Sequence, residues 1–411
     1  MTLPHPSDLA RHWTLDPSIC FLNHGSFGAT PRVVQEAQAH YRERLEREPI
    51  DFFVIQHQQL MDKVRAAVAA FVHCPADCLA LVPNATIGVA TVFDNLNLKP
   101  GDEILINDHE YPACQNNARR AAARAGGDVK VVAAAPPFPN PTPEAIVESL
   151  LAKVSPRTRL ALISHVTSPS GLVLPVERLV AELTRRGVET LVDGAHAPGM
   201  VPSLNLEKLK PTYYTANCHK WICSPKGSAL LYVSPEKRDG FRPVVLSNNA
   251  EKPKPGRAQF LTEFDFIGTQ DYTSIYAIPD AIEFMGSLVP GGWPEVMARN
   301  HALVLKGRDI ICNALNIEPT APDNMVGSIC TMILPPHRPE LQARLAARPT
   351  KYADALQDNL LAKHRIQVPV WGIAGRPGRY LRISAQLYNS VEQYEYLAAA
   401  LKEELAGESK F

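Results

Sequence analysis

Four residues that could do chemistry lie at or beside the ends of predicted apolar segments. Thr86 opens a predicted helix, whose free N–H groups and positive dipole end suit a phosphate group. Asp193 closes an apolar run, where a buried carboxylate stays ionised only if it meets a cation. Lys220 lies beside Trp221, and desolvation there would lower its pKa and make its amine a nucleophile. Arg382 could clamp a carboxylate with two parallel hydrogen bonds.

Each of these residues also has a simpler structural explanation. Thr86 or Asn84 could cap the helix, and Asp193 could form a structural ion pair. Lys220 could lie on the surface, and Arg382 could belong to a solvated strand face. Their combination carries more information than any one of them. A phosphate cradle, an acid for a pyridinium nitrogen and a lysine able to form a Schiff base are the groups that pyridoxal 5′-phosphate requires of a protein.

Composition restricts the class of protein. The chain has 411 residues, 42 Lys and Arg against 42 Asp and Glu, and 45% hydrophobic residues, values that exclude intrinsic disorder. Zero net charge and the lack of a basic run argue against a nucleic-acid partner. No apolar stretch reaches the ~18–20 residues of a membrane span, and residues 1–13 lack the apolar core of a signal peptide. We therefore expect a cytoplasmic protein with no membrane contact.

The 8 cysteines are scattered through apolar surroundings, which predicts reduced, buried thiols in place of disulfides. Cys74 and Cys78 lack a second ligand pair downstream, so no metal site is predicted. The prolines between Pro136 and Pro143 predict a loop that joins two elements.

The apolar pattern predicts the elements that must position these residues. Between residues 79 and 233, short apolar runs alternate with helical patterns, which is typical of a parallel sheet covered by helices on both faces. Ligands bind at the carboxyl ends of the strands in such sheets. The predicted strands are Leu79–Val82, Glu103–Ile106, Val129–Ala133, Arg159–His165, Thr190–Asp193, Tyr213–Asn217 and Ala229–Val233. The predicted helices are Ile87–Leu96, Cys114–Ala125, Ala145–Lys153 and Val176–Arg186.

After about residue 285 the pattern changes to longer helices and fewer strands. There Ser390 and Gln393 predict a capping box before a final helix that extends through Glu404. We predict an α/β protein with a large, doubly wound, mostly parallel sheet domain and a smaller α+β C-terminal domain. The predicted limits are an N-terminal segment at 1–30 that lines the active site, the large domain at 31–284 and the small domain at 285–411.

The order of the motifs resembles the class V aminotransferase family, whose members have PLP fold type I. The resemblance rests on Asn84-Ala85-Thr86, Ser164-His165-Val166-Thr167-Ser168, Asp193-Gly194-Ala195-His196 and His219-Lys220-Trp221. Two further segments narrow it to the isopenicillin N epimerase-like branch: Leu22-Asn23-His24-Gly25-Ser26-Phe27-Gly28 and Phe266-Ile267-Gly268-Thr269-Gln270-Asp271. The similarity extends from Leu22 to Ser384 and implies an enzyme that uses pyridoxal 5′-phosphate.

The resemblance implies a role for each matching residue around the cofactor ring. Lys220 forms the Schiff base and is the expected general base, and Asp193 pairs with the pyridine nitrogen. His196 lies near the phenolic oxygen of the ring. Tyr111 matches the aromatic residue that stacks on the cofactor face, with His109 as the second choice, and Ser168 borders the ring.

A second group of matching residues is implied to hold the cofactor phosphate. Thr86, Asn217 and His219 bind it, and Ala85 adds backbone support. Thr269 is implied to reach the phosphate of the neighbouring subunit, so a homodimer with shared active sites is expected.

Arg382 matches the residue that clamps the substrate carboxylate, and Asn23 and His24 are implied to line the same cleft. Cysteine desulfurases of this class carry a nucleophilic cysteine on a loop shortly before that arginine. Residues 368–380 contain no cysteine, and the nearest one upstream is Cys330. The sequence therefore disfavours desulfurase chemistry.

The resemblance implies chemistry at the Cα–H of an amino acid, with an epimerase-type reaction as the first expectation. Epimerisation needs a second acid on the face of Cα opposite to Lys220, and Tyr111 and Cys218 are the candidates for it. C–S β-elimination on a cysteine derivative, which needs only Lys220 and a leaving group, is the alternative. Transamination ranks below both. A non-catalytic relative ranks last, because a degenerate site has no reason to keep Lys220, Asp193, Thr86 and Arg382 together.

Overall fold

A seven-stranded sheet forms the centre of the protein, of which a computed structural model describes residues 3–408. Its strand order is β2-β8-β7-β6-β5-β3-β4, and all strands are parallel except β8, which is antiparallel to β2 and β7. The inner strands are continuous buried apolar runs, as expected for a sheet covered on both faces. Their bounds are Leu79–Val82 (β2), Glu103–Asn107 (β3), Lys130–Ala134 (β4), Thr158–Ser164 (β5), Glu189–Asp193 (β6), Tyr213–Asn217 (β7) and Ala229–Val233 (β8).

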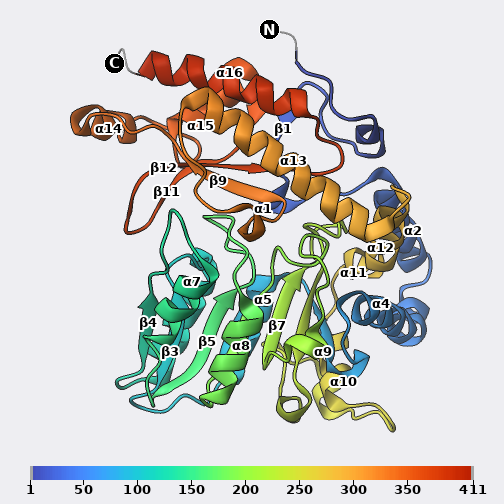
Figure 1. Ribbon diagram of the computed structural model, residues 1–411. Coiled ribbons are helices and arrows are strands. Elements are labelled where there is room, and N and C mark those ends of the chain that lie inside the picture. The colour runs from blue at the N-terminus through green and yellow to red at the C-terminus, as the bar shows by residue number, and fades with distance from the viewer. Residues whose placement is uncertain (1–2, 409–411) are drawn as a thin grey trace.

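Helices cover both faces of this sheet (Figure 1). Alternate residues of a strand point to opposite faces, so Leu162 of β5 joins the apolar cluster under α5 and α6. Its neighbour Ile163 joins the larger cluster that contains α4 and α8. The helices of this region are His57–Val72 (α4), Ala85–Asn95 (α5), Pro112–Ala125 (α6), Pro143–Leu151 (α7), Val176–Arg185 (α8), Leu206–Leu209 (α9) and Gln259–Asp265 (α10).

A second, three-stranded sheet lies above the first in Figure 1 and is antiparallel, with the order β11-β12-β9. Helices α13 and α16 pack against each other beside it. The bounds are Gly292–Leu315 (α13), Ile329–Ile333 (β9), Pro339–Ala346 (α14), Ala355–His364 (α15), Val370–Ile373 (β11), Arg376–Ser384 (β12) and Val391–Glu408 (α16). Besides α1 (His24–Phe27), which belongs to the N-terminal segment, the remaining described α-helices before α13 are Arg32–Arg47 (α2), Pro49–Asp51 (α3), Thr273–Tyr276 (α11) and Ile278–Ser287 (α12).

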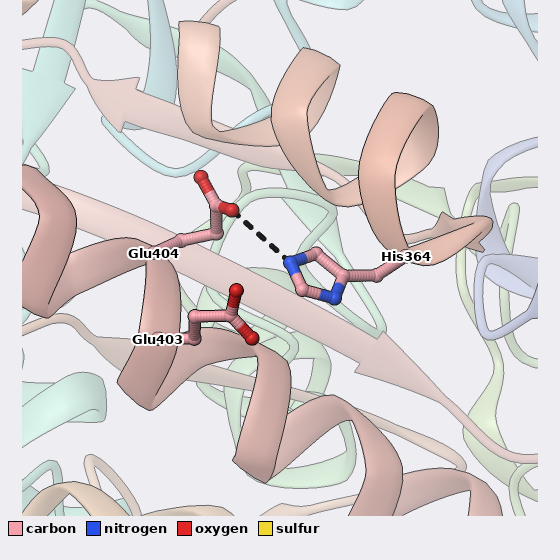
Figure 2. Close-up of side chains that lie close together, drawn as sticks. All are labelled: His364, Glu403 and Glu404. Carbon is pink, nitrogen blue, oxygen red and sulfur yellow. Dashed lines mark hydrogen bonds and ion pairs between the residues drawn. The ribbon is translucent and has the colours of Figure 1, made fainter. Parts of the chain in front are cut away.

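A buried contact between a histidine and a glutamate joins α15 to α16 (Figure 2). His364 Nε2 lies 3.1 Å from Glu404 Oε1, and Glu404 also accepts hydrogen bonds from Lys363 Nζ and Asn359 Nδ2. His364, Glu403 and Glu404 place one ligand atom each within 4.8 Å of one another, close enough for a metal ion. Because the Glu404 carboxylate is already engaged by Lys363, Asn359 and His364, we interpret the group as a structural contact between the two helices.

The N-terminal segment connects the two sheets. Strand β1, Cys20–Phe21, pairs in parallel with β10, Ile366–Gln367, and the short helix α1, His24–Phe27, follows it. Gly28 then adopts a left-handed φ of 70°. A Cβ on Gly28 would lie 1.9 Å from the carbonyl oxygen of His219, so the chain can pass the His219–Lys220 loop only with glycine here.

The α/β architecture predicted from the sequence is confirmed, and each predicted strand is present with its ends within one residue. The division at residue 285 stays a prediction: that residue lies inside α12, and the larger apolar cluster runs from α4 to α16. None of the described helices is long and apolar enough to span a membrane.

Replacing Gly28 with alanine should disturb the lysine loop. We expect Gly28→Ala to lower the free energy of unfolding by about 1–3 kcal/mol more than Gly101→Ala. Gly101 is a matched control, because its φ is also positive, at 87°, but a Cβ there meets nothing within 4 Å. Urea denaturation of the two variants measures the difference. Equal losses would show that the close approach to His219 has no energetic consequence.

Candidate active site

A cavity of about 460 Å³ lies where the carboxyl ends of β2, β5, β6 and β7 approach β12. Parallel strands bring their carboxyl ends to one edge of the sheet, so residues far apart in the sequence meet there. Most of the predicted site residues line this cavity: Ala85, Thr86, Tyr111, Ser168, Asp193, His196, Asn217, His219, Lys220 and Arg382.

The Lys220 amine lies in this cavity, 3.1 Å from His196 Nε2. Burial lowers the pKa of Lys220 to about 8; the charge of Arg382 acts in the same direction, and that of Asp193 opposes it. A larger share of the amine is therefore neutral near pH 7 than in an exposed lysine, and the neutral form is the nucleophile. His24 Nε2 donates a hydrogen bond of 2.9 Å to the Lys220 carbonyl oxygen and fixes the backbone of this residue.

Asp193 ends β6 and is 4% exposed. Its Oδ1 accepts the backbone N–H of Ala195 at 2.9 Å, and its Oδ2 lies 3.1 Å from the Cys114 thiol. Burial raises the pKa of Cys114 well above its ordinary value, so the thiol keeps its proton and donates it. A carboxylate has about four acceptor positions. Asp193 therefore keeps acceptor capacity for a partner in the cavity.

The first turn of α5 presents one free backbone donor to the cavity. Asn84 Oδ1 accepts the N–H of Ile87 at 2.9 Å, and Asn217 Oδ1 accepts that of Ala85 at 2.8 Å. Among the described contacts, the N–H of Thr86 between them has no partner. Asn217 thus acts as a second cap of this helix, with only its amide nitrogen left for a ligand.

Arg382 is 2% exposed and is held by neutral groups. Nη1 donates to the carbonyl oxygen of Ser168 at 2.7 Å, and Nη2 donates to Ser26 Oγ at 3.2 Å. The guanidinium carbon lies 4.8 Å from the ring centroid of Trp371, a cation–π contact. Nε is buried without a partner among the described residues, and no described carboxylate forms an ion pair with this arginine. Burial lowers the pKa of Arg382 to about 10, so it stays charged near pH 7.

Asn23 and His24 are not among the residues that line the cavity, so their expected role toward the substrate stays a prediction. His24 is fully buried, and its two ring nitrogens bond to Tyr388 Oη and to the Lys220 carbonyl oxygen. Asn23 Oδ1 accepts a hydrogen bond from Ser26 Oγ. The next residues of the segment, Gly25, Ser26 and Phe27, line the cavity instead.

Two further expectations concern residues that lie outside this cavity. Thr269 is exposed in the segment between α10 and α11, and its role toward a neighbouring subunit stays a prediction. Cys218 is fully buried and does not line the cavity. Burial raises its pKa to about 12, and its position outside the cavity favours Tyr111 over Cys218 as the second acid.

Sequence reasoning missed Trp371 and Lys226, which also line the cavity. Trp371 pairs with Tyr380 across the β11–β12 hairpin. Because alternate residues of a strand share a face, this register places Trp371 on the face of Arg382. A prediction of the β11–β12 hairpin from the sequence would have identified Trp371 as a neighbour of Arg382. Lys226 lies in the loop after Lys220, and neither its spacing nor its neighbours set it apart from a surface lysine.

The residues present fit pyridoxal 5′-phosphate. Lys220 offers an amine for covalent attachment, Asp193 an acceptor for a ring nitrogen and Thr86 a free N–H at a helix start for a phosphate. Among the described residues that line the cavity, Lys220, Lys226 and Arg382 are cationic and Asp193 is the only acid. This excess of positive charge complements a phosphate together with a carboxylate.

Comparison with known proteins agrees with this geometry. Residues 19–348 match the family model Aminotransferase class-V. The chain is 32% identical to isopenicillin N epimerase of Streptomyces clavuligerus over 407 residues, which cover 96% of each chain. It is 28% identical to putative L-cysteine desulfhydrase 2 of Oryza sativa subsp. japonica over 431 residues, which cover 96% of this chain and 86% of the relative.

Among solved structures, a lysine-to-alanine mutant of C-DES with glycine covalently linked to its PLP cofactor has a TM-score of 0.77 with this chain. The two chains are 22% identical, and the match covers 95% of this chain and 98% of the other. At this identity the likeness shows the fold, which is PLP fold type I as predicted. The protein therefore belongs to the aminotransferase class-V family and is an enzyme whose cofactor is pyridoxal 5′-phosphate.

Proposed function

We propose that this enzyme inverts the configuration at Cα of an amino acid, in the manner of an epimerase. The observation that carries the proposal is the pairing of two side chains in one cavity: the Lys220 amine, whose pKa burial lowers, and Arg382, whose buried guanidinium lacks a carboxylate partner among the described residues. Relatives named isopenicillin N epimerase align over nearly the whole chain and support this reaction as the first choice.

In the proposed mechanism, Arg382 binds the substrate carboxylate through its guanidinium and so orients Cα toward Lys220. Bound pyridoxal 5′-phosphate supplies an electron sink that acidifies the Cα–H of the amino acid. Lys220 would remove the Cα proton as general base through its neutral amine. Asp193 would accept a hydrogen bond from the protonated pyridine nitrogen of the bound cofactor.

Epimerisation also needs a proton donor on the face of Cα opposite to Lys220. Of the two candidates, Tyr111 lines the cavity and Cys218 does not. Tyr111 immediately precedes α6 and is 46% exposed, so its hydroxyl can exchange protons with water. We propose Tyr111 as the second acid.

The second candidate function is C–S β-elimination on a cysteine derivative. Relatives named L-cysteine desulfhydrase also align over 96% of the chain, and this reaction needs no acid beyond Lys220.

A protein-bound persulfide is not part of either proposal. Cys330, the cysteine nearest to Arg382 on its upstream side, is buried in β9, and burial raises its pKa to about 12, so it is a poor nucleophile.

We further propose that the enzyme is a homodimer in which Thr269 reaches the cofactor phosphate of the neighbouring subunit. Exposure of Thr269 and its position outside its own cavity support this arrangement. Sedimentation equilibrium of the holoenzyme tests the assembly, and a monomer would contradict it.

The carboxylate role of Arg382 predicts a kinetic defect. Arg382→Ala should raise KM and lower kcat/KM on the order of 10²-fold, the equivalent of ~3 kcal/mol for a lost charge-assisted contact. Arg382→Lys should recover little, because an ammonium group cannot form two parallel hydrogen bonds. Arg379→Ala is the control: Arg379 lies on the same strand but pairs with Asp354 and Glu408, so stability should fall while KM is unchanged. Normal kcat/KM in Arg382→Ala would remove this residue from substrate binding.

The reaction type is tested by incubating the holoenzyme with a panel of L-amino acids, cysteine included, in deuterated water. We expect deuterium at Cα of recovered substrate and the opposite enantiomer at a comparable rate, both lost in Lys220→Ala. Chiral analysis, a pyruvate assay and mass spectrometry of the protein are read together. Pyruvate without the D-isomer would replace the epimerase with the lyase. A stoichiometric, turnover-competent cysteine persulfide would contradict both, and a purified protein that stays colourless after incubation with pyridoxal 5′-phosphate would contradict catalysis by this cofactor.

A further inference from the structure

Trp221, the residue after Lys220, is fully buried. Its indole Nε1–H donates a hydrogen bond of 3.2 Å to Nδ1 of His196. The other nitrogen of that ring, Nε2, lies 3.1 Å from Lys220 Nζ. One imidazole thus connects the indole on one side to the reactive amine on the other.

The indole determines where the His196 proton resides. An indole N–H can only donate a hydrogen bond, so Nδ1 must accept it and carries no proton. Burial lowers the pKa of His196 well below its ordinary value, and the charges of Lys220 and Arg382 act in the same direction. The ring is therefore neutral, and its single proton lies on Nε2. Lys220 can accept that proton in a hydrogen bond only through a free lone pair, as the neutral amine.

We propose that Trp221 is a positioning residue that holds His196 in the Nε2–H tautomer and thereby favours the neutral form of the Lys220 amine. Without the indole donor, the imidazole can carry its proton on Nδ1, and Nε2 then accepts a hydrogen bond from protonated Lys220. A hydrogen bond that favours the charged form of an amine raises its pKa. The inference rests on the proposed role of Lys220 as nucleophile and base.

The other groups around the amine act on it whichever tautomer His196 adopts. Arg382 lowers the pKa of Lys220, whereas Asp193 and Cys114 raise it. None of them bonds to the indole nitrogen in the described structure. Exchange of Trp221 for phenylalanine therefore isolates the donor. The titratable groups around the amine include Arg382, Asp193, Cys114, His24, His196 and His219, and Tyr111 and Lys226 line the same cavity.

The pH dependence of cofactor capture by the apoenzyme tests the proposal, with pyridoxal 5′-phosphate as the probe and growth of its visible band as the signal. The capture rate follows the fraction of neutral amine, so the wild-type midpoint is expected near pH 8. Trp221→Phe should raise the midpoint by about one pH unit and slow capture near pH 7 by about tenfold. Trp13→Phe is a matched control, because Trp13 is also buried and donates its Nε1–H to the Ala29 carbonyl oxygen at 3.1 Å. This variant should keep the wild-type midpoint.

A double-mutant cycle separates the tautomer from loosened packing. In a His196→Gln background, Trp221→Phe should cause no further shift, because the tautomer no longer exists. A further shift of equal size would overturn the proposal, as would an unchanged midpoint in the single Trp221→Phe variant. Thermal melting establishes that each variant is folded.

A second measurement avoids the Trp221 variant. Imidazole ¹⁵N NMR of the wild-type apoenzyme labelled with [¹⁵N]histidine, assigned through His196→Gln, reads the tautomer directly. A proton on Nε2 supports the proposal, and one on Nδ1 overturns it. Neither measurement involves an amino-acid substrate. If the enzyme proves not to be an epimerase, the capture midpoint and the His196 tautomer still test the role of Trp221. If the role of Trp221 is refuted, the reaction type is still decided by the experiment in deuterated water.

Discussion

Two cationic side chains share the central cavity, the half-buried Lys220 and the buried Arg382, and the rest of the site depends on how the protein accommodates them. Neither Lys220 nor Arg382 forms an ion pair with a described carboxylate. Burial of an unpaired charge is unfavourable, and it lowers the pKa of both groups. Lys220 reduces this cost by releasing its proton more readily than an exposed lysine does. Arg382 keeps its proton, and its buried Nε–H has no partner among the described residues.

The fold maintains this arrangement from three directions. The parallel strands β6 and β7 deliver Asp193 and the loop that carries Lys220 to one edge of the main sheet. Strand β12 of the second sheet delivers Arg382. The N-terminal segment lies between them: His24 bonds to the Lys220 carbonyl, and Ser26 Oγ accepts a hydrogen bond from Arg382. Contacts made by neutral groups thus hold both cations in place and leave their charges for the ligands.

The sequence was sufficient to predict the sheet and the residues that follow its strands. Asp193 and Lys220 could be found because each ends or follows an apolar run, and strand ends in a parallel sheet coincide in space whatever the connections between them. The cap that Asn217 provides to α5 was not predictable, because it joins residues that are 132 positions apart. The same limit applies to His24. The motif around this residue indicated that it lies near the site, but the motif could not show that its ring bonds to Tyr388 and to the Lys220 backbone. Local pattern identifies which residues approach the site, and only tertiary packing determines which of their atoms point into it.

The central claim is that Lys220, and not the second lysine of the cavity, Lys226, carries the cofactor. Both lysines line the cavity, and desolvation lowers the pKa of each, so the direction of the pKa shift does not separate them. Their positions do, because Lys220 is half-buried with its amine 3.1 Å from His196 Nε2, whereas Lys226 is exposed. The most direct measurement is reduction of the holoenzyme with borohydride, followed by peptide mapping of the fixed cofactor. We predict a single modified peptide that contains Lys220, with the modification absent in Lys220→Ala and retained in Lys226→Ala. Modification of Lys226, or of any other lysine, in the wild-type enzyme would contradict the account.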